Sequence, residues 1–196
     1  MNKIRLIYTY IGSIRLIPHL FLYKFSSHRK IISQDIDRWV ECLHLTIPSH
    51  MQYLYLMTNF KEYRNLFYYR IGIAAILIKW LCPPMNTLFI STEDIGAGLF
   101  IPHGFATIIA AKSIGKNCKI YQQVTIGYNY KDAPVIGDNV NIYPGAVVVG
   151  AVIIGDNSKI SAGATVVNKN IPANAVVVPA KAAIVRLNGE KINQML

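Results

Sequence analysis

The chain has 196 residues, of which 53% are hydrophobic, and it carries a formal charge of +10. Residues 1–90 hold 11 Lys and Arg against 4 Asp and Glu, whereas the remainder holds 9 against 6. A basic half can face nucleic acid, anionic lipid or a polyanionic substrate. No zinc-finger spacing or RNP-like aromatic motif occurs, so nucleic acid is not an expected partner.

Residues 4–25 are mostly apolar, with the basic residues Lys3 and Arg5 at the start, as in a signal peptide. Arg15, Pro18 and His19 interrupt the run and no small-x-small cleavage site follows, so a secretory signal is not expected. No uncharged apolar run reaches the roughly 18 residues of a spanning helix. Three scattered cysteines form no CxxC pair, which fits a reducing compartment. We expect a cytoplasmic protein. Contact of its basic, aromatic segment with an anionic membrane or a lipid-linked glycan remains an open alternative.

The first half of the chain is expected to be helical, as an N-terminal region over residues 1–90. Ser33 is the predicted N-cap of one helix, with Asp35 and Asp37 in its first turn. Apolar residues then recur at helical spacing up to the proline at position 48: Ile36, Trp39, Val40, Leu43 and Ile47.

Two further helices are predicted before the second half begins. Ser49 is the predicted start of a short helix that runs through Met57, and Asn59 is the predicted N-cap of a longer one. Pro83 and Pro84 end that last helix, because proline cannot continue a helical hydrogen-bond ladder.

The second half, residues 91–196, is organised by an aliphatic residue at every sixth position. A period this long is an internal repeat and indicates a solenoid. One extra residue falls between 101 and 108, four extra residues fall between 126 and 136, and Ile171 and Val177 follow one residue short. The predicted inward residues are Ile95, Ile101, Ile108, Ile114, Ile120, Ile126, Ile136, Ile142, Val148, Ile154, Ile160, Val166, Ile171 and Val177.

Smaller residues recur four positions after these and are predicted to face inward as well. Gly in the second slot and the Asp-Asn pairs at 138–139 and 156–157 are predicted to supply turns with positive φ. Three such blocks make one triangular coil whose strands pair in parallel with the next coil. Lys112 and Lys181 break the pattern. The small inward residues are Leu99, Phe105, Cys118, Val124, Val140, Ala146, Val152, Ser158, Ala164 and Ala175.

Three segments carry a resemblance to a known family: residues 95–104 (IGAGLFIPHG), 122–127 (QQVTIG) and 160–167 (ISAGATVV). They resemble the hexapeptide-repeat acyltransferases, in the serine O-acetyltransferase branch and its relatives that acetylate bacterial surface polysaccharides. Residues 62–70 (EYRNLFYYR) also resemble the colanic-acid and capsular acetyltransferases. The resemblance implies an α+β chain in which N-terminal helices precede a left-handed parallel β-helix. It also implies a homotrimer, with a dimer of trimers left open.

The resemblance also implies that acetyl-CoA is the co-substrate and lies in the groove between neighbouring solenoids of the trimer. Small residues on the matching segments would let the pantetheine arm approach the backbone, although the same residues can serve as ordinary turns and core of the repeat. Two lysines are candidates for the CoA phosphates. The cofactor-binding candidates are Gly145, Ala146, Ala162, Gly163, Lys169 and Lys181.

His103 is the sole histidine of the repeat region, and it stands where the resembled family carries its general base. A hydroxyl nucleophile needs a base within hydrogen-bond reach, and imidazole suits that task near neutral pH. The N–H of Gly127, on a matching segment, is the candidate donor to the oxyanion. No metal is expected, because a zinc site needs three protein ligands and only one histidine is available here.

The extra residues after Ile126 must leave the solenoid as a loop, and such loops often shape a binding site. Serine acetyltransferases carry a second histidine before the proline of this loop, whereas this chain has Ala133 before Pro134. We therefore predict a saccharide acceptor on a bacterial surface-polysaccharide unit. Serine O-acetyltransferase and a non-catalytic β-helix scaffold are the alternatives. The acceptor-binding candidates are Gln122, Tyr128, Asn129, Lys131 and Asp132.

Overall fold

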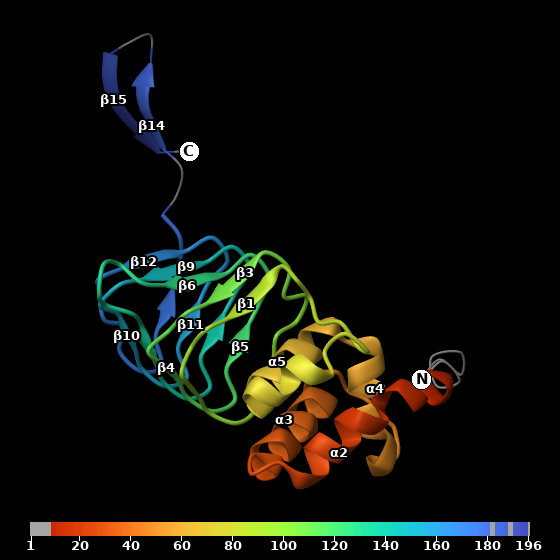
Figure 1. Cartoon of the computed structure of the whole chain (residues 1–196). Coiled ribbons are helices and arrows are strands. Elements are labelled where there is room, and N and C mark those ends of the chain that lie inside the picture. Colours follow the sequence, from red (N-terminus) through yellow and green to blue (C-terminus); the bar gives the residue numbers. More distant parts are fainter. Residues whose placement is uncertain (1–8, 181–182, 188–189, 196) are drawn as a thin grey trace.

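A computed structural model describes residues 9–180, 183–187 and 190–195, and it places a group of helices before a solenoid of parallel strands (Figure 1). This is the architecture predicted from the sequence. Residues 9–12 are helical, and no described helix is both long and apolar enough to cross a membrane. The remaining helical segments are η1 (Ile14–Leu16), α2 (Ile17–Phe25), α3 (Arg29–Cys42), α4 (Ser49–Asn59), α5 (Lys61–Ile71) and η2 (Gly72–Leu77).

The predicted N-caps at Ser33 and Asn59 are wrong. α3 begins at Arg29, after a turn in which the His28 N–H donates to Ser26 Oγ over 3.0 Å, so Ser33 lies inside the helix. Asn59 ends α4 instead of starting α5, because its amide donates back to the Tyr55 carbonyl over 2.9 Å. In both cases a polar residue that often caps helices has another partner or position.

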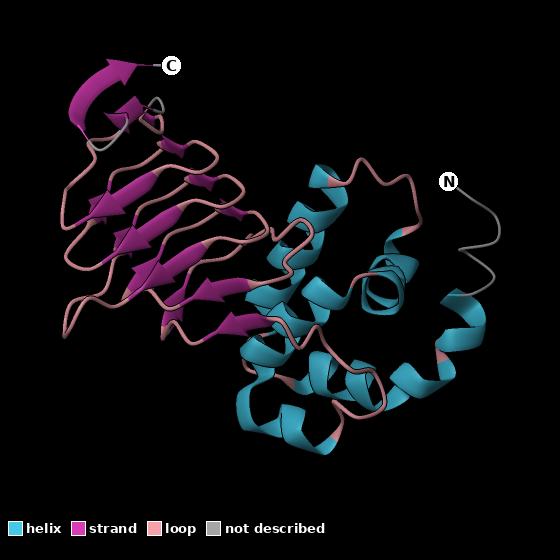
Figure 2. Cartoon of the chain, turned by 90° about the horizontal axis from the view of Figure 1, so that it is seen from above, coloured by secondary structure: helices cyan, strands magenta, loops and turns pink. Residues whose placement is uncertain are grey.

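Three parallel sheets form the faces of a solenoid of about five turns, and Figure 2 shows the stacked coils from above. The first sheet has the order β1-β3-β6-β9-β12, the second β10-β7-β4-β2 and the third β13-β11-β8-β5. The three middle coils each contribute one strand to each face, whereas the first and last coils have an isolated bridge, at Phe100 and Ile171, in place of one strand. The strands are β1 (Leu88–Ile90), β2 (Asp94–Ile95), β3 (Thr107–Ile109), β4 (Ser113–Ile114), β5 (Lys119–Ile120), β6 (Thr125–Gly127), β7 (Val135–Ile136), β8 (Asn141–Ile142), β9 (Val147–Val149), β10 (Ile153–Ile154), β11 (Lys159–Ile160), β12 (Thr165–Val167) and β13 (Val176–Val177).

The inward row follows the six-residue period except at one position. Ile109 is fully buried and pairs with Ile126, whereas Ile108 is 44% exposed, so the prediction that Ile108 faces inward is wrong. Phe105 is also wrongly predicted, because it is 46% exposed. The coil corner after Ile101 thus holds two extra residues instead of one. From Ile136 to Val166 every predicted sixth residue is buried.

The glycines in the second repeat slot are required for a different reason from the positive φ angles that were predicted. Among them, a Cβ on Gly115 would lie 2.6 Å from the backbone of Gly137, and one on Gly155 would lie 2.4 Å from the Ala173 nitrogen. Their φ angles are not positive, so close stacking of the coils requires glycine there. The positive φ angles of this corner fall on asparagines, as the Asp-Asn pairs predicted: Asn117, Asn139, Asn157 and Asn174.

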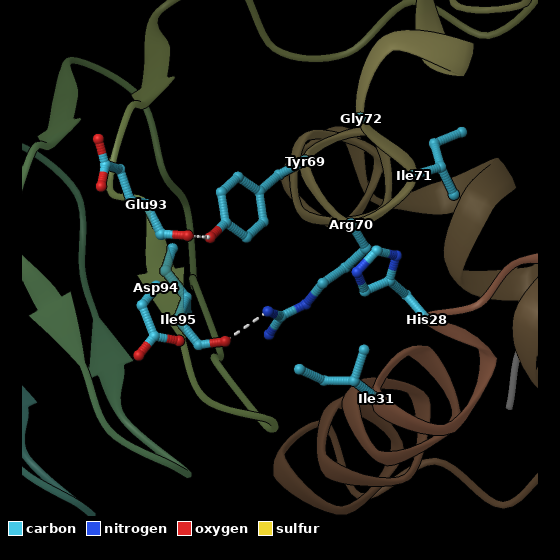
Figure 3. Close-up of a pocket in the computed structure, with 9 residues that line it drawn as sticks. All are labelled: His28, Ile31, Tyr69, Arg70, Ile71, Gly72, Glu93, Asp94 and Ile95. Carbon is cyan, nitrogen blue, oxygen red and sulfur yellow. Dashed lines mark hydrogen bonds between the residues drawn. The ribbon is translucent and has the colours of Figure 1, made fainter.

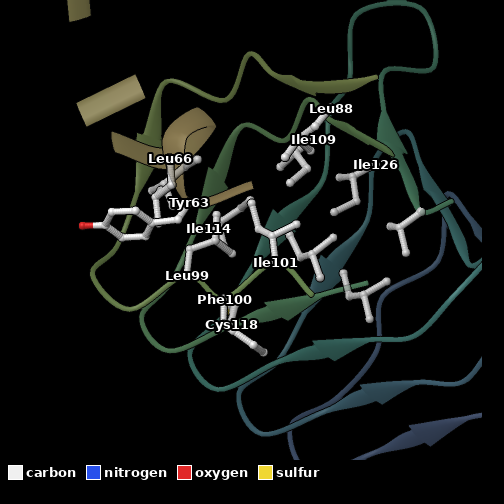
Figure 4. Packing of buried hydrophobic residues seen from close by; sticks show 14 of the residues in the cluster. Tyr63, Leu66, Leu88, Leu99, Phe100, Ile101, Ile109, Ile114, Cys118 and Ile126 are labelled. Carbon is white, nitrogen blue, oxygen red and sulfur yellow. The ribbon is translucent and has the colours of Figure 1, made fainter. Parts of the chain in front are cut away.

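The helices and the first coil share one hydrophobic core. The Trp39 indole N–H donates to the Leu99 carbonyl over 2.8 Å, and its ring packs edge-on against Phe100 at 4.9 Å. Figure 4 shows Tyr63 and Leu66 of α5 beside the inward residues of the first coils. The open end of the first coil is therefore covered by helix side chains, which protects its apolar interior from water.

A buried ion pair joins α3, α5 and the first coil. Arg70 Nε lies 2.8 Å from Asp35 Oδ2, and the two side chains are 4% and 2% exposed. The Arg70 guanidinium also donates to the carbonyls of Ile95 (2.5 Å) and Gly96 (2.7 Å), and Asp35 accepts the Gly98 N–H at 2.7 Å. Figure 3 shows Arg70 reaching across a cavity of about 340 Å³ toward Ile95. Because the Arg70 guanidinium already has partners within the chain, this cavity marks the contact between the helices and the first coil.

After the solenoid the chain forms an antiparallel hairpin of β14 (Ala183–Leu187) and β15 (Glu190–Met195). The hairpin stands away from the last coil in Figure 1. Strands therefore follow the end of the repeat over residues 183–187 and 190–195.

Candidate active site

His103 lies at the corner where the chain passes from the third face of the solenoid to the first. It is exposed and has a φ of 60°, in the left-handed region. A non-glycine residue adopts this conformation rarely, and in this chain it recurs at corners of the solenoid, as at Ala106 and Gln123. The two extra residues after Ile101 enlarge this corner, and the Phe105 N–H donates to the His103 carbonyl within it. The imidazole therefore stands on a projecting turn of the first coil.

The same corner continues as a ladder down the solenoid. Gln123, Gly145 and Gly163 stack at equivalent positions, each with positive φ. The Gln123 N–H donates to Phe105 O over 3.0 Å, Gly145 N–H to Gln122 O over 3.2 Å, and Gly163 N–H to Pro144 O over 3.0 Å. The ladder connects the corner of His103 to the glycines predicted to hold CoA.

The lower part of this ladder leaves room for a ligand. A Cβ built on Gly163 would meet no atom within 4 Å, and one on Gly145 would meet only the Gly163 nitrogen at 3.9 Å. Ala162 is exposed beside them, whereas Ala146 is fully buried and belongs to the core of the repeat. Three of the four small CoA candidates thus lie on an open surface that fits a narrow, flexible chain passing close to the backbone.

A carboxylate that the sequence analysis did not single out lies beside this corner. The Cγ of Glu62, in the first turn of α5, is 3.2 Å from where a Cβ on Gly104 would stand. Glu62 is half-buried, and no described residue forms a hydrogen bond or ion pair with it. This contact joins positions 42 residues apart, so no local sequence pattern could have revealed it.

Polar and aromatic groups on the second and third coils extend the corner. The rings of Tyr121 and Tyr143 stack at 5.2 Å, and partial burial raises the pKa of the Tyr121 hydroxyl. The side-chain oxygen of Gln122 is buried and has no partner among the described residues. A buried acceptor without a partner is costly, so a donor from outside the described residues would stabilise Gln122.

The loop that follows β6 lies at the next corner, between the first and second faces. Backbone hydrogen bonds of 2.9 and 3.3 Å between Asn129 and Asp132 close it into a tight turn. Tyr128, Lys131 and Asp132 are exposed and line a cavity of about 480 Å³. Lys112 and Asn170, from other coils, also line this cavity.

The remaining candidates also belong to this second corner or fall outside the structure. Gly127 ends β6 next to the loop, and a Cβ on it would meet nothing within 4 Å. Lys169 is exposed after β12, at the same corner two coils from the loop. Lys181 lies outside the described residues. No group of three His, Cys, Asp or Glu side chains that could hold a metal ion is found in the described part of the chain.

The structure therefore separates the predicted site residues into two groups. His103 and Gln122 share the first corner with the glycine ladder, whereas Gly127 and the loop residues occupy the second. A strand of the first face lies between the two corners in every coil. Within one chain, the predicted base does not meet the predicted oxyanion donor.

Comparison with known proteins agrees with the repeat and the fold. A family described as "Bacterial transferase hexapeptide (six repeats)" matches residues 133–168. No curated protein sequence matches the chain. Serine acetyltransferase isoform 3 of Entamoeba histolytica, solved in complex with cysteine, is similar with a TM-score of 0.64 and 26% identity. That match covers 84% of this chain and 63% of the Entamoeba chain, so less than two thirds of that protein's length is spanned.

Two bacterial structures show the same fold. The serine acetyltransferase of Neisseria gonorrhoeae, in complex with serine, gives a TM-score of 0.65 with 22% identity over 92% of this chain and 83% of that one. The enzyme of Brucella abortus gives 0.63 with 21% identity over 89% and 74%. At these identities the two bacterial structures show the fold alone. The chain thus carries the hexapeptide repeat of bacterial transferases on a fold that it shares with serine acetyltransferases.

Proposed function

We propose that the protein is an acetyl-CoA-dependent O-acetyltransferase in which His103 is the general base and a sugar hydroxyl is the acceptor. The observation that carries the proposal is the exposed histidine in a left-handed turn, at the head of a corner whose lower rungs are open glycines. A base is thereby presented at one end of a surface that suits the pantetheine arm of the donor.

The residues suggest a direct transfer. His103 takes the proton of the acceptor hydroxyl as the oxygen attacks the thioester carbonyl of acetyl-CoA. The carbon–sulfur bond then breaks, and the imidazolium returns the proton to the departing thiolate. Glu62, beside Gly104, is placed to accept a hydrogen bond from another hydroxyl of the acceptor. In this scheme Gly145, Ala162 and Gly163 line the path of the donor.

The two-corner arrangement favours a site shared between copies of the chain. In a trimer the His103 corner of one copy would face the loop corner of the next. The Gly127 N–H, Lys169 and the loop residues would then complete the site from the neighbouring copy, and Lys169 would pair with a CoA phosphate. The shared site is tested by mixing two variants, each expected to be inactive alone. One carries His103→Ala, and the other carries both Lys131→Ala and Asp132→Ala. Recovery of activity on mixing is expected, and its absence would contradict a shared site.

The choice of a sugar rests on the charges available near His103. A free amino acid needs a cation for its carboxylate and an anion for its ammonium group. Two arginines of α5 are not available, because Arg64 donates to three backbone carbonyls and Arg70 is paired with Asp35. A sugar needs only hydrogen-bonding partners such as Glu62 and Gln122. L-Serine stays the second candidate, because the structural neighbours are serine acetyltransferases.

The base assignment is tested by His103→Ala, with His44→Ala as a matched control. His44 is likewise exposed with a positive φ of 50°, so alanine introduces a similar backbone strain there. Loss of a general base costs roughly 10²–10⁴-fold in rate. We expect that loss in kcat/KM for His103→Ala, measured by thiol release from acetyl-CoA, and no measurable change for His44→Ala. Equal activity of the two variants would remove His103 from the mechanism.

The acceptor is tested with the same assay and a panel of sugars, nucleotide sugars and L-serine. We expect turnover with a sugar and little with L-serine. Preferred turnover of L-serine would establish the second candidate. If no acceptor releases thiol and acetyl-CoA does not bind, the non-catalytic scaffold becomes the supported function.

A further inference from the structure

A stripe of exposed apolar residues runs along the N-terminal helical segment, over residues 9–25. We name Tyr10, Ile14, Ile17, Phe21 and Phe25 the N-terminal stripe; they are 54%, 74%, 62%, 62% and 67% exposed. Their spacing of three or four residues places them on one side of a helix. The opposite side is buried, since Thr9, Leu16 and His19 are fully inaccessible. The segment thus has an apolar face toward the protein core and a second apolar face toward solvent.

The stripe contains a paired aromatic group. The rings of Phe21 and Phe25 lie 4.6 Å apart on successive turns of α2. Large side chains exposed together in this way are unusual on a protein that has no partner for them, and such patches mark interaction sites. Folding has already used the other side of the helix, so the packing of the described chain does not account for the stripe.

The sequence around the stripe is basic and contains no acidic residue. Residues 1–34 hold 6 Lys and Arg and no Asp or Glu. Lys24, Arg29 and Lys30 are exposed at the C-terminal end of the stripe. In addition, none of the three forms an ion pair within the described residues. The surface therefore combines bulky apolar groups with unneutralised positive charge.

This combination fits a lipid surface better than a second copy of the same face. Two copies joined through the stripe would bring Lys24, Arg29 and Lys30 close to their own equivalents, and such repulsion opposes association. An anionic bilayer accepts both components, because apolar side chains enter the acyl boundary while basic groups remain among the headgroups. No described helix could span a bilayer, so the segment would lie in the plane of its surface.

We propose that the N-terminal stripe and its basic neighbours bind the surface of an anionic phospholipid membrane. Residues of α2 enter the headgroup region, and Lys24, Arg29 and Lys30 contact lipid phosphates. This inference does not depend on the acetyl-transfer proposal, because it rests on residues remote from His103 in sequence and needs no catalytic activity.

Sedimentation of the full chain with vesicles tests the proposal. Phosphatidylcholine vesicles are compared with vesicles that also contain phosphatidylglycerol, at low and high salt. We expect binding to the phosphatidylglycerol vesicles that salt weakens. Phe21→Ser with Phe25→Ser should abolish it. Lys24→Gln with Lys30→Gln should weaken it by roughly 25-fold, since each basic residue near such a surface contributes about five-fold.

A matched control carries the same kinds of change on the solenoid. Val176 is 63% exposed and Lys159 is exposed, so Val176→Ser with Lys159→Gln removes comparable groups elsewhere. This control should bind vesicles like the unchanged chain, and thermal melts should show all variants folded. Equal binding of the stripe variants and the control would overturn the proposal. The proposal would also be overturned if the unchanged chain did not bind vesicles and the double variant Phe21→Ser with Phe25→Ser had a lower oligomeric mass. That result would identify a second copy of the chain as the occupant of the stripe.

Discussion

Replacing Arg70 by methionine should destabilise the protein strongly, because it leaves Asp35 as a buried charge without its partner. The change removes an ion pair of 2.8 Å and hydrogen bonds to two carbonyls of the first coil. Breaking a buried pair by removing one member costs about 3–5 kcal/mol. For a chain of this size each kcal/mol lowers Tm by about 2–4 °C. A fall in Tm on the order of 10 °C is therefore expected.

The assay is thermal or urea unfolding followed by the fluorescence of Trp39, which is buried against the first coil. Arg38→Met is the matched control, because Arg38 also pairs with a carboxylate at 2.7 Å, but with Glu41, which is 70% exposed. Exposed pairs contribute about 0–1 kcal/mol. A loss for Arg70→Met no larger than that of Arg38→Met would refute the reasoning.

A double variant separates the ion pair from the hydrogen bonds. Replacing both members by apolar residues, as in Asp35→Leu with Arg70→Met, removes the uncompensated charge and is often neutral where packing is retained. Here the Gly98 N–H and two carbonyls lose their partners as well. The double variant should therefore recover only part of the stability lost in Arg70→Met.

Three further predictions concern packing and pH. Ile109→Ala should cost about 2–5 kcal/mol as a buried truncation, whereas Ile108→Ala should cost far less; equal unfolding midpoints for the two would contradict the register found here. Gly104→Ala should lower the midpoint, because the added methyl would stand 2.9–3.2 Å from three side-chain carbons; an unchanged melt would show that the corner can relax. Burial lowers the pKa of His19 from 6.5 to about 4. The unfolded chain then binds the proton more readily than the folded chain. The free energy of unfolding is therefore not reduced by His19 above pH 6.5, and it falls by up to about 3 kcal/mol as the pH decreases toward 4. His19→Gln should flatten this decline in urea unfolding, and an unaltered pH profile would exclude His19 as its source.

The solenoid was predictable because its defining pattern is contained in short stretches of sequence. Each coil needs one aliphatic residue per face, and from Ile136 to Val166 the chain supplies it without interruption. The prediction failed at Ile108 and Ile109, where two adjacent aliphatic residues fit the period about equally well. Pairing with the neighbouring strand decides between them, and counting along the chain does not include that pairing.

Helix starts and the composition of the site were less predictable for the opposite reason. Asp35 has a sequence position typical of a helix N-terminus, yet its partner lies 35 residues away in α5. The contact of Glu62 with Gly104 is similarly long-range. His103 itself could be identified from the repeat, but the corner that each insertion occupies follows only from the order of the faces. From the sequence alone, His103 was therefore grouped with a loop that lies on another corner of the solenoid.

The two ends of the solenoid differ, and this difference has a consequence for how the protein opens. The first coil is sealed by α3 and α5, whereas the final coil ends in Val176 and Val178, which are 63% and 68% exposed. In a stacked array each coil is held by its neighbours, so a coil with one neighbour frays first. Amide hydrogen exchange should therefore be graded along the array, fastest in β13 and slowest in β3 and β4, which lie next to the coil that the helices cover.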